Sequence, residues 1–87
     1  MSHLSNMLAL GLLAVSSLSY ANEPVNINRA DAATLAQAIA GVGVARAEAI
    51  VQYRKKHGPF ESIEDLTLVR GIGDRTVEEN RRTLTVD

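Results

Sequence analysis

Two short glycine-containing segments carry the residues whose types and spacing could do chemistry. In "AIAGVGVAR" one apolar residue stands between Gly41 and Gly43, and "LVRGIGDRT" repeats the pattern at Gly71 and Gly73, an offset of 30 residues (71 minus 41). Glycine adopts positive φ easily, and another surface can lie directly against its amide. Amides of such a turn, together with the free N–H groups of a following helix, attract anions and above all phosphate. The segments therefore predict two phosphate contacts.

A tight interhelical turn that only ends a helix is the alternative explanation for one Gly-apolar-Gly segment. Two copies at a fixed offset, each followed closely by a basic residue (Arg46 and Arg75), favour the binding role. Dinucleotide-binding and P-loop sites are excluded, because neither segment follows an expected strand and no Gly-Lys-Ser/Thr is present. We name residues 41–43 the first glycine turn and residues 71–73 the second.

The chain around the first glycine turn shows helical spacing with start and stop signals, and no strand-like alternation. Asp31 is the expected N-cap of a helix that runs to about Ala40. A second helix is expected from about Ala45 to His57, where Gly58 takes the left-handed conformation and the next proline prevents continuation. The expected buried positions of the two helices are Leu35, Ala38, Ile39, Ala47, Ile50, Val51 and Tyr53.

The second glycine turn is expected to join another pair of helices. Residues 62–65, "SIED", read as a capping box that opens the third helix, and Asp74 as the cap of the next. Glu78 is expected to pair with Arg82 at i, i+4. The inward positions are Ile63, Leu66, Val69, Val77 and Leu84, with Val25 and Ile27 of an extended lead-in against the same core. The fold class is therefore all-α, with two helix-hairpin-helix units.

The first 21 residues are expected to be a secretory signal peptide. Residues 8–18 form an apolar run too short for a transmembrane helix, which needs about 20 residues. Small residues at Ser19 and Ala21 then precede a polar stretch, as at a signal-peptidase site. Cleavage after Ala21 leaves a domain of residues 22–87; an uncleaved anchor or a buried helix are the alternatives.

The charge and composition exclude several functions. Nine basic and ten acidic residues give a net charge of -1, so no long-range field draws the chain to DNA or to an anionic membrane. The absence of cysteine removes disulfides and thiolate metal sites, and we expect no metal or cofactor. His57 reads as a helix-end residue, and 66 residues leave no room for a base-flipping pocket. We expect no catalytic residues and no enzymatic activity.

The mature chain resembles the tandem helix-hairpin-helix domain of the ComEA competence-protein family. The motifs that carry this resemblance are "VNIN", "GVG...A..I..YR...GPF" and "L..V.GIG..T". The resemblance implies a SAM-like bundle of four to five short helices in the periplasm. It also implies that the protein binds double-stranded DNA without sequence preference during natural transformation. Components of the DNA-uptake machinery are candidate partners, and no stable membrane insertion is expected after cleavage.

The resemblance also implies which residues meet the phosphate backbone. Each hairpin would grip one strand across the minor groove, through backbone amides with arginines at the rim. These residues are Gly41, Val42, Gly43, Ala45, Arg46, Gly71, Ile72, Gly73, Arg75 and Thr76. The chain departs from the family where Val44 and Asp74 replace a common proline, and Asp74 would set a carboxylate beside the phosphate.

One alternative of a different class remains open. Tandem helical hairpins also dock on proteins, and the neutral charge fits a protein-interaction or structural module of the envelope. The basic cluster Arg54, Lys55 and Lys56 is either a solvated helix end or a secondary phosphate contact. Base stacking on single strands is less favoured, because Tyr53 and Phe60 read as core anchors.

Overall fold

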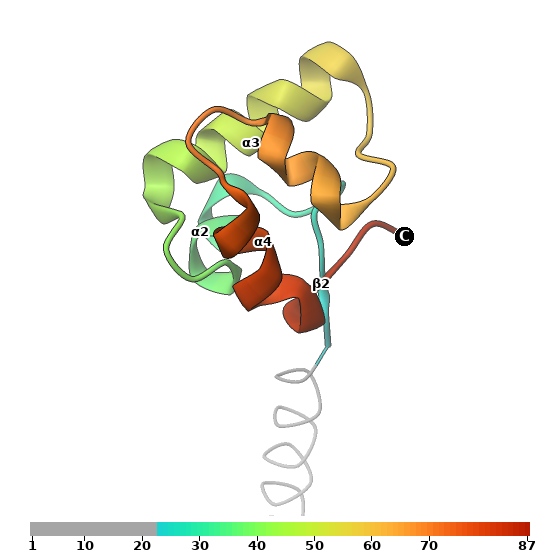
Figure 1. Ribbon diagram of the computed structural model, residues 1–87. Helices are drawn as coiled ribbons and strands as arrows, with labels where there is room; N and C mark the ends of the chain where they lie inside the picture. Colours follow the sequence, from blue (N-terminus) through green and yellow to red (C-terminus); the bar gives the residue numbers. More distant parts are fainter. Residues whose placement is uncertain (1–22) are drawn as a thin grey trace, which may run out of the picture.

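The computed structural model describes residues 23–87, and these residues are mainly helical with two very short strands (Figure 1). The all-α prediction is confirmed, whereas the signal-peptide prediction concerns residues 1–21 and lies outside the described residues. The elements are β1 (Val25–Asn26), α2 (Ala32–Ala38), α3 (Gly43–His57), the 3-10 helix η2 (Ile63–Leu68), α4 (Asp74–Asn80), the 3-10 helix η3 (Arg81–Thr83) and β2 (Leu84–Thr85).

The first hairpin consists of α2, the first glycine turn and α3. Asp31 caps α2 as predicted, because its carboxylate accepts a hydrogen bond from Thr34 N at 2.8 Å. The helix ends at Ala38, earlier than the predicted Ala40, because Ile39 is extended with φ -104° and ψ 101°. Helix α3 begins at Gly43 rather than Ala45, with Val42 before it already in the helical region. The connection between the two helices therefore has the predicted length of four residues, but it comprises residues 39–42 instead of 41–44.

Helix α3 ends as predicted at a glycine that is followed by proline. Gly58 has φ 93° and donates from its backbone N to Arg54 O at 2.9 Å. Its ψ of 176° is extended, so the prediction of a left-handed helical conformation is correct in φ only. The side chain of Arg54 turns back and donates from Nη1 to Ile27 O at 2.9 Å, which assigns this member of the basic cluster a structural contact.

The second hairpin differs from the prediction in its helix type and in both of its predicted caps. Its first helix, η2, is a 3-10 helix, and the side chain of Ser62 makes no capping hydrogen bond, so the capping-box prediction is wrong. Instead Asp65 Oδ2 accepts from Glu61 N at 3.1 Å. Asp74 is the first residue of α4 and not its cap; the N-cap is Gly73, which has no side chain to bond the free amides. With six residues, η2 is longer than most 3-10 helices, which seldom exceed about three to four residues.

The two ends of the described chain meet in a two-stranded parallel pairing. Val25 pairs with Leu84 and Asn26 with Thr85, and Ile27 N donates to Thr85 O at 2.9 Å. The sequence did not indicate these strands, because two residues are too few to show alternation. Leu84 is buried as predicted, but it lies in β2 and not on a helix with Val77.

The hydrophobic core is shared by both hairpins. Val42 and Ile72, the apolar residues between the glycines, are buried and point inward as predicted. Phe60 is buried and stacks on the half-buried Tyr53 with ring centroids 5.4 Å apart, in agreement with their prediction as core anchors. The buried apolar residues are Ile27, Leu35, Ile39, Val42, Ala47, Ile50, Phe60, Leu66, Val69, Ile72, Val77 and Leu84.

Candidate nucleic-acid interface

The two glycine turns share one hydrogen bond and the positive φ of their first glycine. In the first turn Val42 N donates to Ile39 O at 3.2 Å, and in the second Ile72 N donates to Val69 O at 3.1 Å. The third residue of each four-residue turn is a glycine at positive φ, 87° at Gly41 and 93° at Gly71. Type II turns require positive φ at this position, and glycine supplies it without strain. The repeat seen in the sequence is therefore also a repeat in backbone structure.

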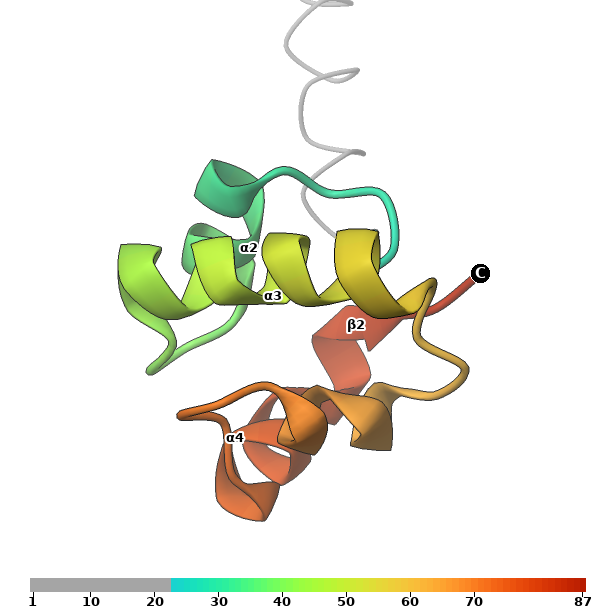
Figure 2. The same cartoon turned by 90° about the horizontal axis from the view of Figure 1, so that it is seen from above.

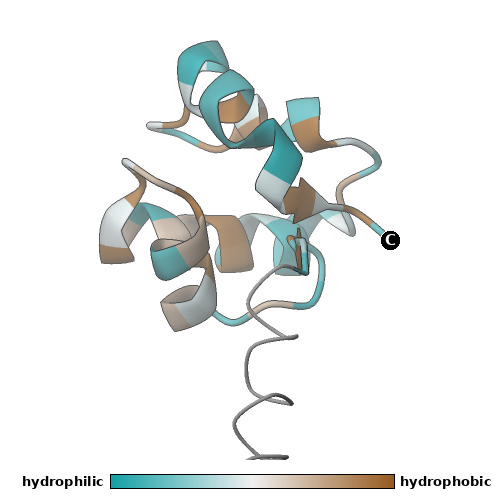
Figure 3. Ribbon diagram, turned by 90° about the horizontal axis from the view of Figure 1, so that it is seen from below, coloured by the Kyte–Doolittle hydropathy of each residue, from teal (hydrophilic) through white to brown (hydrophobic). Residues whose placement is uncertain are grey.

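The two turns lie side by side at one edge of the molecule. Figures 1, 2 and 3 show the α2–α3 turn and the η2–α4 turn at the same edge in three views. Arg46 of α3 extends across to the second turn, since a Cβ added to Gly71 would lie 2.7 Å from Arg46 Nε. Because Gly71 has no side chain, Arg46 of the first hairpin can lie against the turn of the second hairpin.

The second glycines of the turns are not equivalent. Gly43 has φ 73°, whereas Gly73 is extended with φ -103° and ψ 175°. A Cβ added to either glycine would meet no other atom within 4 Å, so this side of both turns is open. The backbone at position 43 therefore favours glycine, whereas the backbone at position 73 can be adopted by other residues.

The charged residues at this edge are distributed unequally between the turns. Arg75 is exposed and its Nε pairs with Glu79 Oε1 at 2.8 Å, so a carboxylate already balances its charge. Asp74 precedes it at the start of α4. Arg46 and Arg70 are exposed. Arg70 was not among the predicted site residues, although its position immediately before Gly71 was a signal that could have found it.

The same inequality holds for the two halves of the described chain. Residues 23–60 contain five basic and three acidic residues, whereas residues 61–87 contain four basic and seven acidic residues. In Figure 3 much of α4 has hydrophilic colours. A polyanion is therefore attracted more strongly to the first hairpin than to the second.

The remaining predicted site residues have different surroundings. Ala45 is exposed in the first turn of α3. Thr76 is half-buried in α4, and its carbonyl accepts from Asn80 Nδ2 at 2.8 Å. The structure thus brings the glycines and Arg46 together at one edge, and places Thr76 partly inside the second hairpin.

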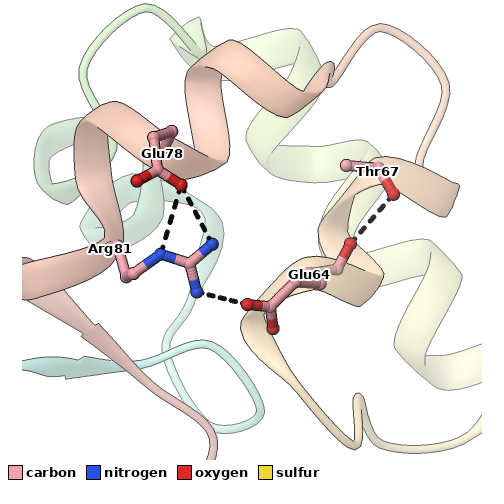
Figure 4. A network of polar contacts seen from close by, with 4 residues as sticks. All are labelled: Glu64, Thr67, Glu78 and Arg81. Atoms are coloured by element: carbon pink, nitrogen blue, oxygen red, sulfur yellow. Dashed lines mark hydrogen bonds and ion pairs between the residues drawn. The ribbon is translucent and has the colours of Figure 1, made fainter.

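Arg81 holds the two helices of the second hairpin together (Figure 4). Its guanidinium pairs with Glu64 of η2 and with Glu78 of α4, the latter at 3.1 Å from Nη2 to Oε2. The hydrogen bond from Arg81 lowers the pKa of the Glu64 carboxyl below its ordinary value. Glu78 thus pairs at i, i+3 with Arg81 and not with Arg82 as predicted.

Residues 23–87 also bear on metal binding and on membrane insertion. Within this part of the chain, no group of three or more His, Cys, Asp or Glu side chains is placed to hold a metal ion. None of its helices has the length and apolar character that crossing a membrane requires.

Comparison with known proteins identifies a family and several relatives with similar sequences. Residues 20–85 match the helix-hairpin-helix motif family. The chain is 48% identical over 62 residues to ComE operon protein 1 of Bacillus subtilis, covering 71% of this chain and 30% of the relative. It is also 48% identical over 60 residues to an uncharacterized protein of Haemophilus influenzae, covering 69% of this chain and 54% of the relative. The resemblance to the ComEA proteins is thereby confirmed at the level of sequence.

A third relative limits what these matches say about catalysis. Human endonuclease/exonuclease/phosphatase family domain-containing protein 1 is 46% identical over 48 residues, which cover 55% of this chain and only 8% of that protein. Such a short match extends no further than the hairpin region and gives no support for nuclease activity. The matches together show a helix-hairpin-helix module. The chain spans about half or less of the first two relatives, and over most of its own length it belongs to the helix-hairpin-helix family.

Proposed function

We propose that this protein binds double-stranded DNA without sequence preference through the backbone amides of its two glycine turns. The observation that carries the proposal is the pair of turns with the same hydrogen bond and the same positive φ at one edge of the molecule. Both turns are open where an added Cβ would point at Gly43 and Gly73. A phosphate backbone can therefore approach the main chain of each turn.

The geometry favours recognition of the phosphate backbone rather than of bases. The apolar residues of both turns point into the core, so the main chain and the arginines remain for contact. Phosphate contacts position a protein on the duplex without carrying sequence information. Helix α3, which has 15 residues, adds the partial positive charge of its N-terminus directly after the first turn.

The near-neutral charge sets the expected strength of binding. Non-specific binding comes almost entirely from phosphate neutralisation and has dissociation constants of about 10⁻⁴ to 10⁻⁶ M at physiological salt. With few arginines at the edge, one of them paired with a carboxylate, we expect the weak end of this range. Binding should strengthen clearly as salt is removed.

A binding assay on the purified protein tests the proposal. Fluorescence anisotropy with labelled duplexes of unrelated sequence is expected to give dissociation constants that agree within about tenfold, and a linear fall of log affinity with log salt. A larger preference for one sequence would contradict backbone recognition. No binding even at about 20 mM salt would refute DNA binding.

We further propose that the protein acts in the periplasm, in the uptake of DNA during natural transformation. The similarity to ComE operon protein 1 and the expected signal peptide support this setting. Deletion of the gene should lower transformation frequency, and a copy without residues 1–21 should not restore it. Restoration by that shortened copy would contradict a role outside the cytoplasm.

A protein-interaction module is the second candidate, and one observation favours it. Val44 is 65% exposed directly after the first glycine turn, and Leu68 is 61% exposed shortly before the second. Phosphate contact does not require apolar side chains at this edge. If Val44→Ser and Leu68→Ser together leave DNA binding unchanged but abolish transformation, a protein contact at these residues is indicated.

A further inference from the structure

The side chain of Asn80 connects the second hairpin to the turn of the first. Asn80 is the last residue of α4 and is only 5% exposed, which makes it the buried polar residue of the described core. Its Oδ1 accepts from Ala40 N at 3.0 Å, and its Nδ2 donates to Ala40 O at 3.2 Å and to Thr76 O at 2.8 Å. Ala40 is the residue immediately before Gly41. The side-chain amide of Asn80 thus bonds both the N–H and the C=O of the residue that leads into the first glycine turn.

This contact constrains geometry in a way that apolar packing does not. A buried amide stabilises the fold only where its hydrogen bonds are made, and an unsatisfied one costs free energy. The pair of bonds to Ala40 fixes both the distance and the orientation of the first turn relative to α4. Asn80 follows Val77 at i+3 on the inward face of α4, where an apolar residue would fill the same space without this directional requirement.

We propose that Asn80 is a positioning residue that holds the two glycine turns in the relative arrangement needed to engage one duplex together. The effect on duplex binding rests on the proposed function, whereas the contact between Asn80 and Ala40 is present without DNA. Two linked sites bind more tightly than either alone only if both can engage at once. Because Asn80 is buried, it acts through the turn and not by touching DNA.

The chain provides a matched control in Asn28. This side chain also makes three hydrogen bonds to main-chain atoms: Oδ1 accepts from Phe60 N at 2.7 Å, and Nδ2 donates to Phe60 O and Val86 O, each at 3.0 Å. Neither Phe60 nor Val86 belongs to a glycine turn. Asn80→Leu and Asn28→Leu therefore remove the same number and kind of hydrogen bonds, but only Asn80→Leu releases a turn.

The first measurement is made on the purified protein without DNA. The chain has no cysteine, so Val44→Cys and Leu68→Cys introduce one spin label near each turn, at residues that are already exposed. Electron–electron distance measurements should show a broadened or displaced distribution in Asn80→Leu and an unchanged one in Asn28→Leu. An unchanged distribution in folded Asn80→Leu overturns the proposal. Should Asn80→Leu not fold, Asn80→Asp, which keeps the size and the acceptor but loses both donors, carries the same expectation.

The second measurement is duplex binding by variants without labels. For Asn80→Leu we expect about tenfold weaker binding and a shallower dependence of log affinity on log salt, because fewer phosphates are neutralised at once. For Asn28→Leu we expect a lower melting temperature with the salt slope retained, since loss of stability alone does not change the number of contacts. Equal affinity and slope in Asn80→Leu and wild type would overturn the proposal. If the wild type does not bind duplex DNA, the proposed function is refuted, and the spin-label distances alone decide whether Asn80 positions the turns.

Discussion

Replacing Gly43 and Gly73 by valine, one at a time, distinguishes two roles of these glycines. One role is to allow the chain to turn, and the other is to leave room for the DNA backbone at the turn. Gly43→Val places a branched residue at φ 73°, where left-handed backbone costs about 1–2 kcal/mol. Reduced freedom of the unfolded chain returns about 0.4–1 kcal/mol. The net expectation is a loss of about 1 kcal/mol, which lowers the melting temperature by about 4–8 °C in a domain of this size.

Gly73→Val should leave stability nearly unchanged. The extended backbone of Gly73, with φ -103° and ψ 175°, suits valine, and no atom lies within 4 Å of an added Cβ. The gain of about 0.4–1 kcal/mol from the unfolded chain offsets the poorer capping by valine, which costs a similar amount. Thermal unfolding followed by circular dichroism measures both variants. Equal destabilisation of the two would contradict the difference in φ that the structure shows.

The same two variants then test the proposed contact. Each valine occupies the open side of its turn, so we expect each to weaken duplex binding by about tenfold, or about 1.4 kcal/mol. The double variant should show no binding at physiological salt. Gly73→Val is decisive, because its fold and stability are preserved. If this variant binds duplex DNA as tightly as the wild type, the second glycine turn does not meet the phosphate backbone.

Three further predictions concern charged side chains. Arg46→Ala should weaken duplex binding more than Arg75→Ala, because Arg75 is paired with Glu79 while Arg46 extends over the second turn. Duplex affinities of both variants, measured over a range of salt concentrations, test this order. A larger loss of affinity in Arg75→Ala would contradict it. Asp74→Asn should tighten duplex binding, because it removes a negative charge beside the proposed phosphate. It should also cost about 0.3–1 kcal/mol of stability, because the Asp74 carboxylate lies in the first turn of α4, where negative charge is favourable. Weaker duplex binding by the folded variant would contradict a phosphate contact at this turn. The lowered pKa of Glu64 adds stability that is present above the ordinary glutamate pKa of about 4.3 and is lost as pH falls through the lowered value. An Arg81→Leu variant lacks this contribution, so its melting temperature should fall less than that of the wild type between neutral and acid pH. Identical pH profiles of the two melting temperatures would refute the ion pair.

The parts of the fold that depend on nearby residues could be predicted from the sequence. The glycine turns, the burial of Val42 and Ile72 within them, and the Asp31 cap were all predicted correctly. Each follows from one residue's backbone freedom or from one side chain that reaches an amide three positions away. Errors at the ends of α2 and α3 were confined to a few residues, because Ile39 and Gly43 adopt conformations that the turn requires. Local chemistry was sufficient for these features.

The arrangement of the candidate site was decided by contacts between segments far apart in the chain. Asn80 meets Ala40 across 40 residues, and the meeting of β1 with β2 joins the two ends of the domain. Arg46 lies over Gly71 only because the second hairpin packs beside α3. No local pattern specifies which segments meet, since the free energy of such a contact depends on the packing of the whole core. The residues of each segment thus account for two glycine turns and for the unequal charge of the two hairpins. The packing of the hairpins against each other placed both turns at one edge (Figure 2), and the folded backbone gave their second glycines different φ values.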